Sequence, residues 1–97
     1  MAVIEMVTFR LAPGVGEEEF LDADQRAQTE VLYAQRGMLR RTTARGAGEE
    51  WLVLTLWGSP DDADASDEAC REETAVSRWL ACMELPSVTT RRYHTLD

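Results

Sequence analysis

Lysine and asparagine are absent from this 97-residue sequence, histidine occurs once and cysteine occurs twice. No apolar run approaches the ~20 residues that span a bilayer, so we predict no transmembrane helix and no membrane partner. Residues 1–5 lack the basic start of a signal peptide, and we expect a mature cytoplasmic protein. No spacing typical of metal ligands, nucleophile–base pairs or a phosphate loop is present. We therefore expect no metal and no cofactor.

The two cysteines, Cys70 and Cys82, fall in predicted helices and lack CxxC spacing. Such cysteines are typical of small buried side chains in a reducing compartment. The spacing alone leaves a disulfide between them open.

The formal net charge of −8 argues against nucleic acid as a partner. All ten basic residues are arginines. Six of them fall in predicted strands, and thirteen of the eighteen acidic residues fall in predicted helices. An arginine-rich sheet beneath acidic helices could bind an anion, but ion pairs within the chain use the same charges more simply.

Alternating apolar residues predict four strands, and helical spacing of apolar residues predicts two helical regions between them. The strands are residues 2–11, 38–45, 51–57 and 88–96; the helical regions are residues 17–35 and, in two parts, 61–72 and 74–84. The order β-α-β-β-α-β is that of a ferredoxin-like α+β fold. Right-handed crossovers place both helical regions on one face of a four-stranded antiparallel sheet. Residues 1–97 are therefore predicted to form a single domain.

Residues 51–57 alternate between two apolar faces, which places this strand near the centre of the sheet. We expect one of these faces to lie on the side of the sheet that no helix covers. There Trp51, Val53 and Trp57 would lie beside Ile4 and Met6 of the first strand. Two tryptophans alone would expose roughly 300–500 Å², which a soluble monomer rarely leaves in water. We therefore predict a homodimer with these five residues in its interface.

Three segments carry a resemblance to a known family: VTFRLAPG at residues 7–14, GMLR at residues 37–40 and LTLWGS at residues 54–59. With them the chain resembles the dimeric α+β barrel superfamily, in its antibiotic-biosynthesis-monooxygenase-like branch. The resemblance implies that two sheets pair face to face into a barrel. It also implies a pocket between each sheet and its own helices.

The resemblance implies less about the chemistry of this chain than about its fold. Cofactor-free oxygenases and haem-degrading proteins of this branch use an asparagine on the first strand, with a tryptophan and a histidine in the second helical region. Val7 occupies the asparagine position, and the single histidine, His94, lies on the last strand. Trp79 lies in the expected region. An oxygenase activity is thus implied at the level of the branch, by analogy of fold.

We expect the pocket to have apolar walls and few polar groups. The ligand-binding residues predicted for it are Val7, Phe9, Leu54, Trp79 and Tyr93. Trp79 could stack on an aromatic ligand, or it could be part of the core beside its apolar neighbours. Tyr93 and His94 point to opposite faces of their strand, so at most one of them shares a given cavity.

Three residues are candidates for catalysis: Glu5, Asp24 and His94. Glu5 alternates with apolar residues of the face assigned to the helices, where desolvation would raise its pKa and suit it as a general base. Its alternative role is an ion pair with Arg91 or Arg92. Asp24 falls within the apolar arc of the first helix and could line the pocket, be solvated at its edge, or pair with an arginine. His94 could equally be structural or exposed.

Three functions follow from these expectations. The first is a homodimer that binds a small molecule, such as an aromatic ligand, in the apolar pocket. The second is a cofactor-independent monooxygenase or isomerase acting on an aromatic or polyketide-like substrate. The third is a structural interaction module without chemistry. A pocket that contains a desolvated Glu5 or Asp24 favours an enzyme, and a pocket filled by its own side chains favours the structural module.

Overall fold

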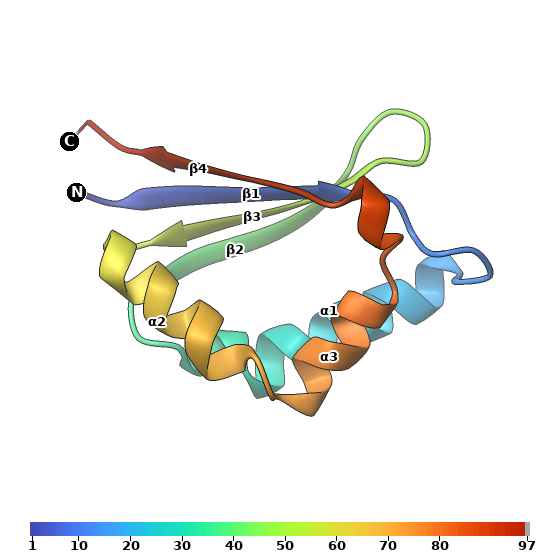
Figure 1. Cartoon of the computed structure of the whole chain (residues 1–97), viewed down its shortest axis with the longest axis horizontal. Helices are drawn as coiled ribbons and strands as arrows, with labels where there is room; N and C mark the ends of the chain where they lie inside the picture. Colours follow the sequence, from blue (N-terminus) through green and yellow to red (C-terminus); the bar gives the residue numbers. More distant parts are fainter. Residues whose placement is uncertain (97) are drawn as a thin grey trace.

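A computed structural model describes residues 1–96 as a four-stranded sheet above one layer of helices (Figure 1). Both ends of the described chain lie at the same end of the sheet. The strands are β1 Val3–Phe9, β2 Met38–Arg45, β3 Trp51–Trp57 and β4 Thr89–His94. The helices are α1 Glu17–Glu30, α2 Pro60–Cys70 and α3 Thr74–Ala81, with short 3₁₀ turns η1 Leu32–Ala34 and η2 Leu85–Ser87. No helix in residues 1–96 is long and apolar enough to cross a membrane.

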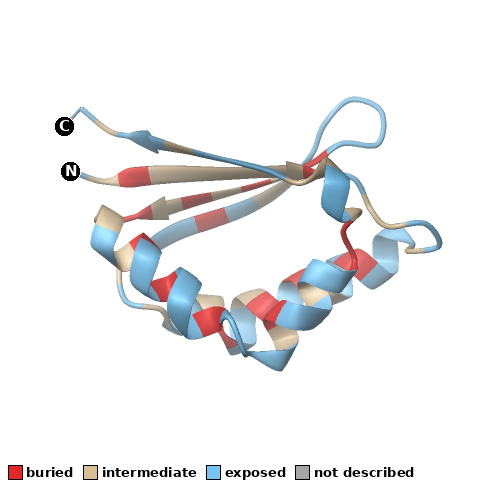
Figure 2. Cartoon of the chain, in the orientation of Figure 1, coloured by how far each residue is buried: buried red, intermediate tan, exposed pale blue. Residues whose placement is uncertain are grey.

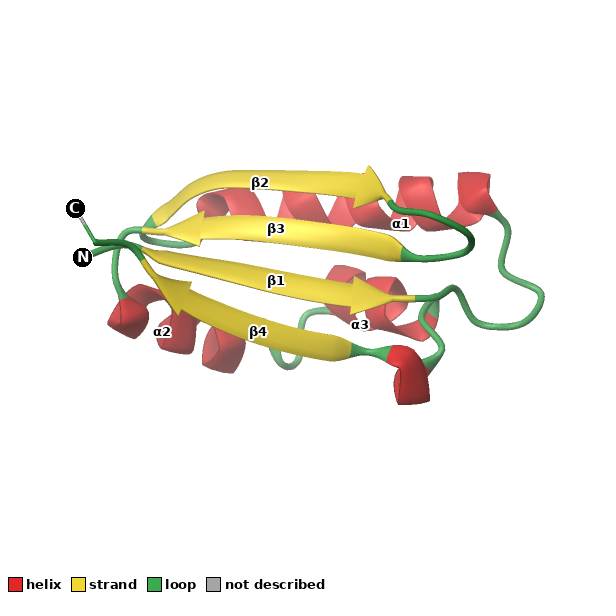
Figure 3. Cartoon of the chain, turned by 90° about the horizontal axis from the view of Figure 1, so that it is seen from above, coloured by secondary structure: helices red, strands yellow, loops and turns green. Residues whose placement is uncertain are grey.

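The strands lie in the order β2-β3-β1-β4, and every neighbouring pair is antiparallel (Figure 3). All three helices lie beneath the same face of this sheet. The predicted ferredoxin-like α+β fold is therefore confirmed. The second and third strands match their predicted bounds, whereas the first helix ends at Glu30 rather than near Gln35.

The start of α2 follows the chemistry that its sequence indicates. Ser59 is the N-cap, and its hydroxyl accepts a hydrogen bond from the backbone N–H of Asp62 at 3.1 Å. Pro60 occupies the first helical position, where its missing N–H has no helical partner to lose. This cap fixes the point at which the chain turns from the central strand back beneath the sheet.

The two faces of β3 are the reverse of those predicted. Trp51, Val53 and Trp57 are buried beneath the sheet against the helices, so their predicted placement on the uncovered face is wrong. Register explains the difference, because β3 pairs Val7 with Val53 and thereby puts the two residues on the same face. An indole ring buries more apolar surface than a leucine side chain, and in β3 the indole rings lie against the helices. The leucines of β3 lie on the uncovered face.

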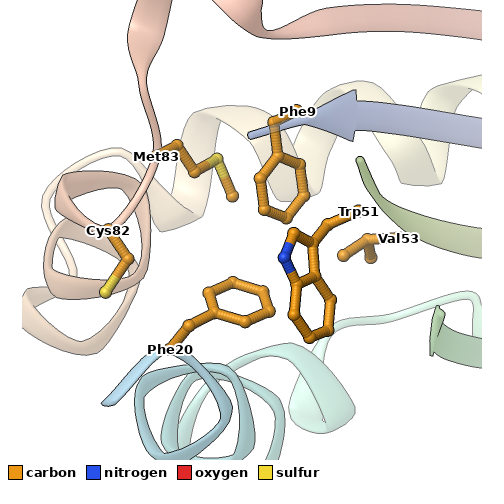
Figure 4. Close-up of a cluster of buried hydrophobic side chains, with 6 residues drawn as sticks. All are labelled: Phe9, Phe20, Trp51, Val53, Cys82 and Met83. Atoms are coloured by element: carbon orange, nitrogen blue, oxygen red, sulfur yellow. The ribbon is translucent and has the colours of Figure 1, made fainter. Parts of the chain in front are cut away.

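A cluster of six buried residues joins the sheet to α1 and the end of α3 (Figure 4). The aromatic rings within it stack at angles: Phe9 lies 5.4 Å from Phe20, and Phe20 lies 5.0 Å from Trp51, between ring centroids. Cys82 is buried in this cluster and Cys70 in another; neither forms a disulfide, as expected for small buried side chains. The buried positions form the layer between sheet and helices (Figure 2). The cluster consists of Phe9, Phe20, Trp51, Val53, Cys82 and Met83.

The uncovered face of the sheet carries an apolar stripe along its two central strands. Ile4 pairs with Leu56, Met6 pairs with Leu54, and both pairs face away from the helices. The placement of Ile4 and Met6 on this face agrees with the sequence prediction. We call the stripe the open-face stripe; it consists of Ile4, Met6, Leu52, Leu54 and Leu56.

Candidate functional site

Four polar residues occupy one row across the helix-facing side of the sheet. Glu5 of β1 pairs with Arg92 of β4 on one side and with Thr55 of β3 on the other. Thr55 in turn pairs with Arg41 of β2. Because paired residues share a face, all four side chains lie on the same side as the helices. A row of polar groups therefore crosses an otherwise apolar layer.

A cavity of about 370 Å³ lies over this row, between the sheet and helices α2 and α3. Its apolar walls include Val7, Val53, Trp57, Val76, Trp79 and Met83. Its polar lining includes Glu5, Arg41, Thr55, Ser66, Asp67 and Arg71. The exposed lining residues belong to β4, to α2 and α3, and to the segment that joins those helices, so the cavity opens to solvent between β4 and these helices. A mostly apolar concavity with a few polar groups is the usual form of a small-molecule site.

Glu5 lies in the wall of this cavity, and its side chain is 15% exposed. Arg92 donates a hydrogen bond from Nη2 to Oε2 of Glu5 at 3.1 Å. Burial raises the pKa of the Glu5 carboxyl above its usual value, and the hydrogen bond from Arg92 offsets this only in part. The predicted ion pair with an arginine is confirmed, and the pKa shift has the direction expected of a desolvated carboxylate.

Arg92 holds three carboxylates together at the edge of the cavity. Its Nη1 donates to Oδ1 of Asp64 at 2.7 Å, and its Nη2 contacts Oδ2 of Asp67 at 3.4 Å as well as Glu5. The hydrogen bond to Asp64 is the main cause of a raised pKa for the Arg92 guanidinium. Burial raises the pKa of Asp67, against the lowering effect of Arg92. One guanidinium thus ties β4 to β1 and to α2.

Asp24 of α1 lies at the opposite end of the polar row. Its carboxylate accepts hydrogen bonds from Nη2 of Arg41 at 2.7 Å, from Oγ1 of Thr43 at 2.7 Å and from Nε1 of Trp79 at 2.9 Å. Only 1% of the Arg41 side chain is exposed, and its guanidinium carbon lies 5.5 Å from the Trp79 ring centroid. Of the roles considered for Asp24, the arginine pair is the one that the structure confirms. Asp24 fixes the groups beside the cavity and does not line it.

Trp57 lines the cavity, and its indole nitrogen is itself buried. The residue is 3% exposed, and its indole N–H has no hydrogen-bond partner within residues 1–96. Buried donors of this kind are rare in folded proteins, because an unsatisfied N–H costs free energy. By contrast, the indole N–H of Trp79 is bound by Asp24.

The remaining predicted residues divide between the cavity, the core and the outer surfaces. Val7 and Trp79 line the cavity, and Phe9 is buried in the neighbouring core cluster. Leu54 and Tyr93 pair with Met6 and Ile4 on the uncovered face, so their predicted place in the pocket is wrong. The cause is again the reversed assignment of β3 for Leu54, and for Tyr93 its register opposite Ile4.

His94 pairs with Val3 at the end of β4, where its side chain is exposed. It does not line the cavity, which argues against its predicted catalytic role. Within residues 1–96, no group of three or more histidine, cysteine, aspartate or glutamate side chains is placed to hold a metal ion.

Sequence reasoning missed Arg41, Thr55 and Trp57 as parts of the site. Alternation along β2 and β3 indicates which residues of each strand share a face, because side chains two positions apart point the same way. Choosing between the two faces of β3 needed the register with β1, which the sequence does not give directly. Ser66 and Cys70 also line the cavity from α2, 3.6 Å apart at their Oγ and Sγ atoms.

A second hollow, of about 660 Å³, lies between α1 and α3. Half of its lining residues are charged, and most of them are exposed. Its lining contains none of the residues of the polar row, and its walls come from two helices rather than from the sheet. The cavity beneath the sheet is therefore the better candidate for a specific site.

Comparison of the sequence with protein-family models and with curated proteins finds no match. Among solved structures, SnoaB, a cofactor-independent oxygenase from Streptomyces nogalater, is similar with a TM-score of 0.81 and 13% identity, over 99% of this chain and 94% of SnoaB. A proposed antibiotic biosynthesis monooxygenase from Caulobacter crescentus has a TM-score of 0.81 and 15% identity, over 99% of this chain and 91% of that one. Another, from Nitrosomonas europaea, has a TM-score of 0.78 and 16% identity, over 98% and 90%.

These similarities extend along almost the whole of each chain, and their TM-scores establish a shared fold. The resemblance that the sequence suggested is therefore confirmed for the architecture. This chain shares the fold of SnoaB and of the two proposed antibiotic biosynthesis monooxygenases.

Proposed function

We propose that this protein binds a small, flat, mostly apolar molecule in the cavity between the sheet and helices α2 and α3. The observation that carries the proposal is the cavity itself, about 370 Å³ of space that the chain's own side chains leave unfilled. Its walls are mostly apolar, it carries a few polar groups and it opens to solvent, which is the usual form of a small-molecule site. The structural module without chemistry would leave it unexplained.

The polar groups of the cavity support a ligand with at least one hydrogen-bonding group. Glu5 offers a carboxylate in a desolvated setting, and Arg41 and Thr55 also line the cavity. Apolar side chains provide the rest of the contact surface. Such a division, in which apolar walls give affinity and a few polar groups fix orientation, is typical of small-molecule sites.

We further propose that the active form is a homodimer joined through the open-face stripe. Five apolar side chains lie along β1 and β3 on a face that no helix covers. Arg40 on one edge strand and Arg91 on the other lie on the same face. A second copy would bury this apolar surface against its own, with the arginines at the solvated rim, and the family resemblance implies this mode of pairing. The cavity lies on the opposite side, so one dimer would carry two separate cavities.

A cofactor-independent monooxygenase or isomerase is the second candidate function, and the desolvated Glu5 is the observation that favours it. A carboxylate with a raised pKa is a stronger base than an ordinary one and could take an acidic proton from a bound aromatic substrate. The resulting carbanion could reduce O₂ directly, with O₂ supplying both oxygen atoms for the ketone and for water. SnoaB, which has this fold, is a cofactor-independent oxygenase.

Filling the cavity tests the binding proposal without touching Glu5 or Trp57. Ser66 is buried on α2 and lines the cavity, so Ser66→Leu would occupy part of its volume. Leucine is also a better helix former than serine, so we expect the variant to remain folded. Ser77→Leu, at an exposed position of α3, is the matched control.

The measurement is the shift in melting temperature that a panel of aromatic alcohols and quinols produces in each variant. We expect a shift for the wild type and for Ser77→Leu, and none for Ser66→Leu. Equal shifts in all three proteins would place binding elsewhere and contradict the proposal.

A further inference from the structure

Three carboxylates beside the cavity share one guanidinium. Arg92 binds Glu5 at 3.1 Å, Asp64 at 2.7 Å and Asp67 at 3.4 Å through its two Nη atoms. The group therefore carries three negative charges and one positive charge when all its members are ionised. Burial raises the pKa of the Glu5 carboxyl, and the nearby charge of Asp67 raises it as well, against the lowering effect of Arg92. Negative charge is thus in excess where the cavity opens between β4 and α2.

The other two arginines of the cavity wall do not balance this excess. Arg41 is already paired with Asp24, and Arg71 is paired with Glu68. Each of these pairs is neutral as a unit. The charge that the cavity presents to a ligand is therefore negative, and a cleft lined by charge of one sign concentrates ligands of the opposite sign.

Thr55 contributes an unpaired hydroxyl to the same cavity. The residue lines the cavity and is 7% exposed, and its Oγ1 forms no hydrogen bond within residues 1–96. In those residues, Nε1 of Trp57 is the one completely buried side-chain nitrogen or oxygen without a partner, so the Thr55 oxygen keeps accessible surface. That surface faces the cavity, because Thr55 pairs with Glu5 and with Arg41 on the helix-facing side of the sheet.

Glu5 and Thr55 place two hydrogen-bond acceptors side by side. They lie directly opposite each other in the pairing of β1 with β3, which puts their Cβ atoms about 4.5–5.5 Å apart. Arg92 binds Oε2 of Glu5, and no residue of the described chain donates to Oε1. A carboxylate oxygen and a hydroxyl oxygen both accept hydrogen bonds, so a group with several N–H donors suits the pair.

We infer that the ligand of this cavity carries a protonated amine, whose ammonium group donates hydrogen bonds to Oε1 of Glu5 and to Oγ1 of Thr55. The inference rests on the proposed function, since it names the charged group by which the cavity recognises its occupant. An ammonium group of this kind has three donors, so both residues are satisfied at once. The apolar part of the ligand then lies against Trp57 and Trp79, which line the same cavity.

The same features discriminate against other classes of ligand. A carboxylate or a phosphate is repelled by the excess of negative charge. An alcohol of the same size forms hydrogen bonds with Glu5 and Thr55 but gains no attraction between opposite charges. A hydrocarbon leaves both residues without a partner. The cavity therefore ranks a cationic ligand first, a neutral polar one second and an anionic one last.

Three ligands of similar size test the inference: 2-naphthylmethylamine, 2-naphthylmethanol and 2-naphthoate. Near neutral pH they are a cation, a neutral molecule and an anion. Equilibrium dialysis at low ionic strength measures their dissociation constants with the wild type, Glu5→Gln, Thr55→Val and Glu17→Gln. Glutamine and valine retain the sizes of the side chains that they replace. Glu17→Gln is the matched control, because it removes the same charge from a half-exposed position that does not line the cavity.

We expect the wild type to bind the amine about tenfold more tightly than the alcohol, since desolvation of the ammonium offsets part of the attraction between the charges. The carboxylate should bind most weakly. Glu5→Gln should abolish the preference for the amine over the alcohol. Thr55→Val should weaken the amine about fivefold, the effect of one hydrogen bond to a neutral acceptor. Glu17→Gln should change that preference by less than about twofold.

Two results would overturn the inference while leaving the binding function intact. A wild type that binds the alcohol as tightly as the amine would show that no positive charge is recognised. Equal loss of the preference in Glu5→Gln and Glu17→Gln would mean that the amine is attracted by the net charge of the whole protein, with no ammonium site at Glu5. Failure of the wild type to bind any of the three would instead contradict the cavity as a ligand site, and with it both proposals.

Discussion

Trp79 of α3 donates a hydrogen bond from its indole Nε1 to Oδ1 of Asp24 on α1, at 2.9 Å. The same carboxylate binds Arg41 and Thr43 of β2, so one side chain joins two helices to an edge of the sheet. Trp79 presents its ring to the cavity. The position of one cavity wall therefore depends on an aspartate that does not itself line the cavity.

Removal of the Asp24 carboxylate should destabilise the protein strongly. The Arg41 side chain is buried, with only 1% of it exposed. In Asp24→Ala, its guanidinium would lose its ion-pair partner. Loss of one partner from a buried ion pair typically costs about 3–5 kcal/mol. Urea denaturation of the variant and the wild type measures the difference in free energy of unfolding.

Asp22→Ala provides the control, because Asp22 makes an exposed ion pair with Arg26 on the same helix. Its cost should be below about 0.5 kcal/mol. Similar costs for the two variants would show that Asp24 does not hold the two helices and β2 together.

Glu5→Gln should change the dependence of stability on pH. A carboxyl whose pKa in the folded chain exceeds its ordinary value of 4.5 binds its proton more tightly when folded. The stability that this binding adds is complete below pH 4.5 and is lost as the pH rises through the folded-state pKa. Glutamine does not titrate, so the stability of the variant relative to the wild type should increase as the pH rises from 4.5 to 8.

Urea midpoints across this pH range measure the effect. Glu17→Gln is the control, since Glu17 also pairs with an arginine but is half exposed. If the stability of the wild type instead increased relative to that of Glu5→Gln with rising pH, the ion pair with Arg92 would lower the pKa of Glu5 by more than burial raises it.

The faces of β3 show where sequence reasoning succeeded and where it stopped. Strict alternation correctly divided residues 51–57 into two apolar sets, and the position of the strand near the sheet centre followed from that. Both sets were apolar enough to be buried, so hydrophobicity did not decide between them. The decision lies in the pairing of Val7 with Val53, a long-range contact that alternation within one strand does not contain.

The candidate site was predictable to a similar depth. Glu5 was placed on the helix-facing side because it alternates with Val3 and Val7, and its arginine partner was anticipated. The polar row required the register of all four strands together. The unpaired N–H of Trp57 depends on side-chain packing around the cavity, which no periodicity in the sequence reports.

Charge on the open-face stripe should dissociate the proposed dimer. Leu54→Arg places a guanidinium in the centre of that face, where a second copy would bury it without a partner. We expect light scattering to give about twice the 10.9 kDa of one chain for the wild type and a single chain for the variant. Ala65→Arg, on the exposed side of α2, should remain a dimer.

Trp57→Arg tests whether Trp57 lies in the core of the subunit or in the dimer interface. Because Trp57 is buried against the helices, this change should unfold the subunit rather than yield a folded monomer. A folded, monomeric Trp57→Arg protein, or a monomeric wild type, would contradict the arrangement proposed for the two faces.

Haem should survive incubation with this protein and a reductant. The chain has no asparagine, and its single histidine, His94, is exposed on β4 away from the cavity. The Soret band should therefore persist as it does in the absence of protein. Stoichiometric uptake of haem, followed by loss of that band, would show that other side chains ligate and orient the porphyrin.

The central claim is that the cavity beneath the sheet binds a small aromatic molecule beside Trp57 and Trp79, which line it. The chain has three tryptophans, so a proton–nitrogen correlation spectrum should contain three indole N–H resonances, with that of Trp57 identified by its loss in Trp57→Phe. Addition of 2-naphthol should move the Trp57 and Trp79 resonances, because an aromatic ring bound against these side chains changes their local magnetic field, and should leave that of Trp51 in place. A Trp57 resonance that stays fixed at the solubility limit of 2-naphthol would contradict the account.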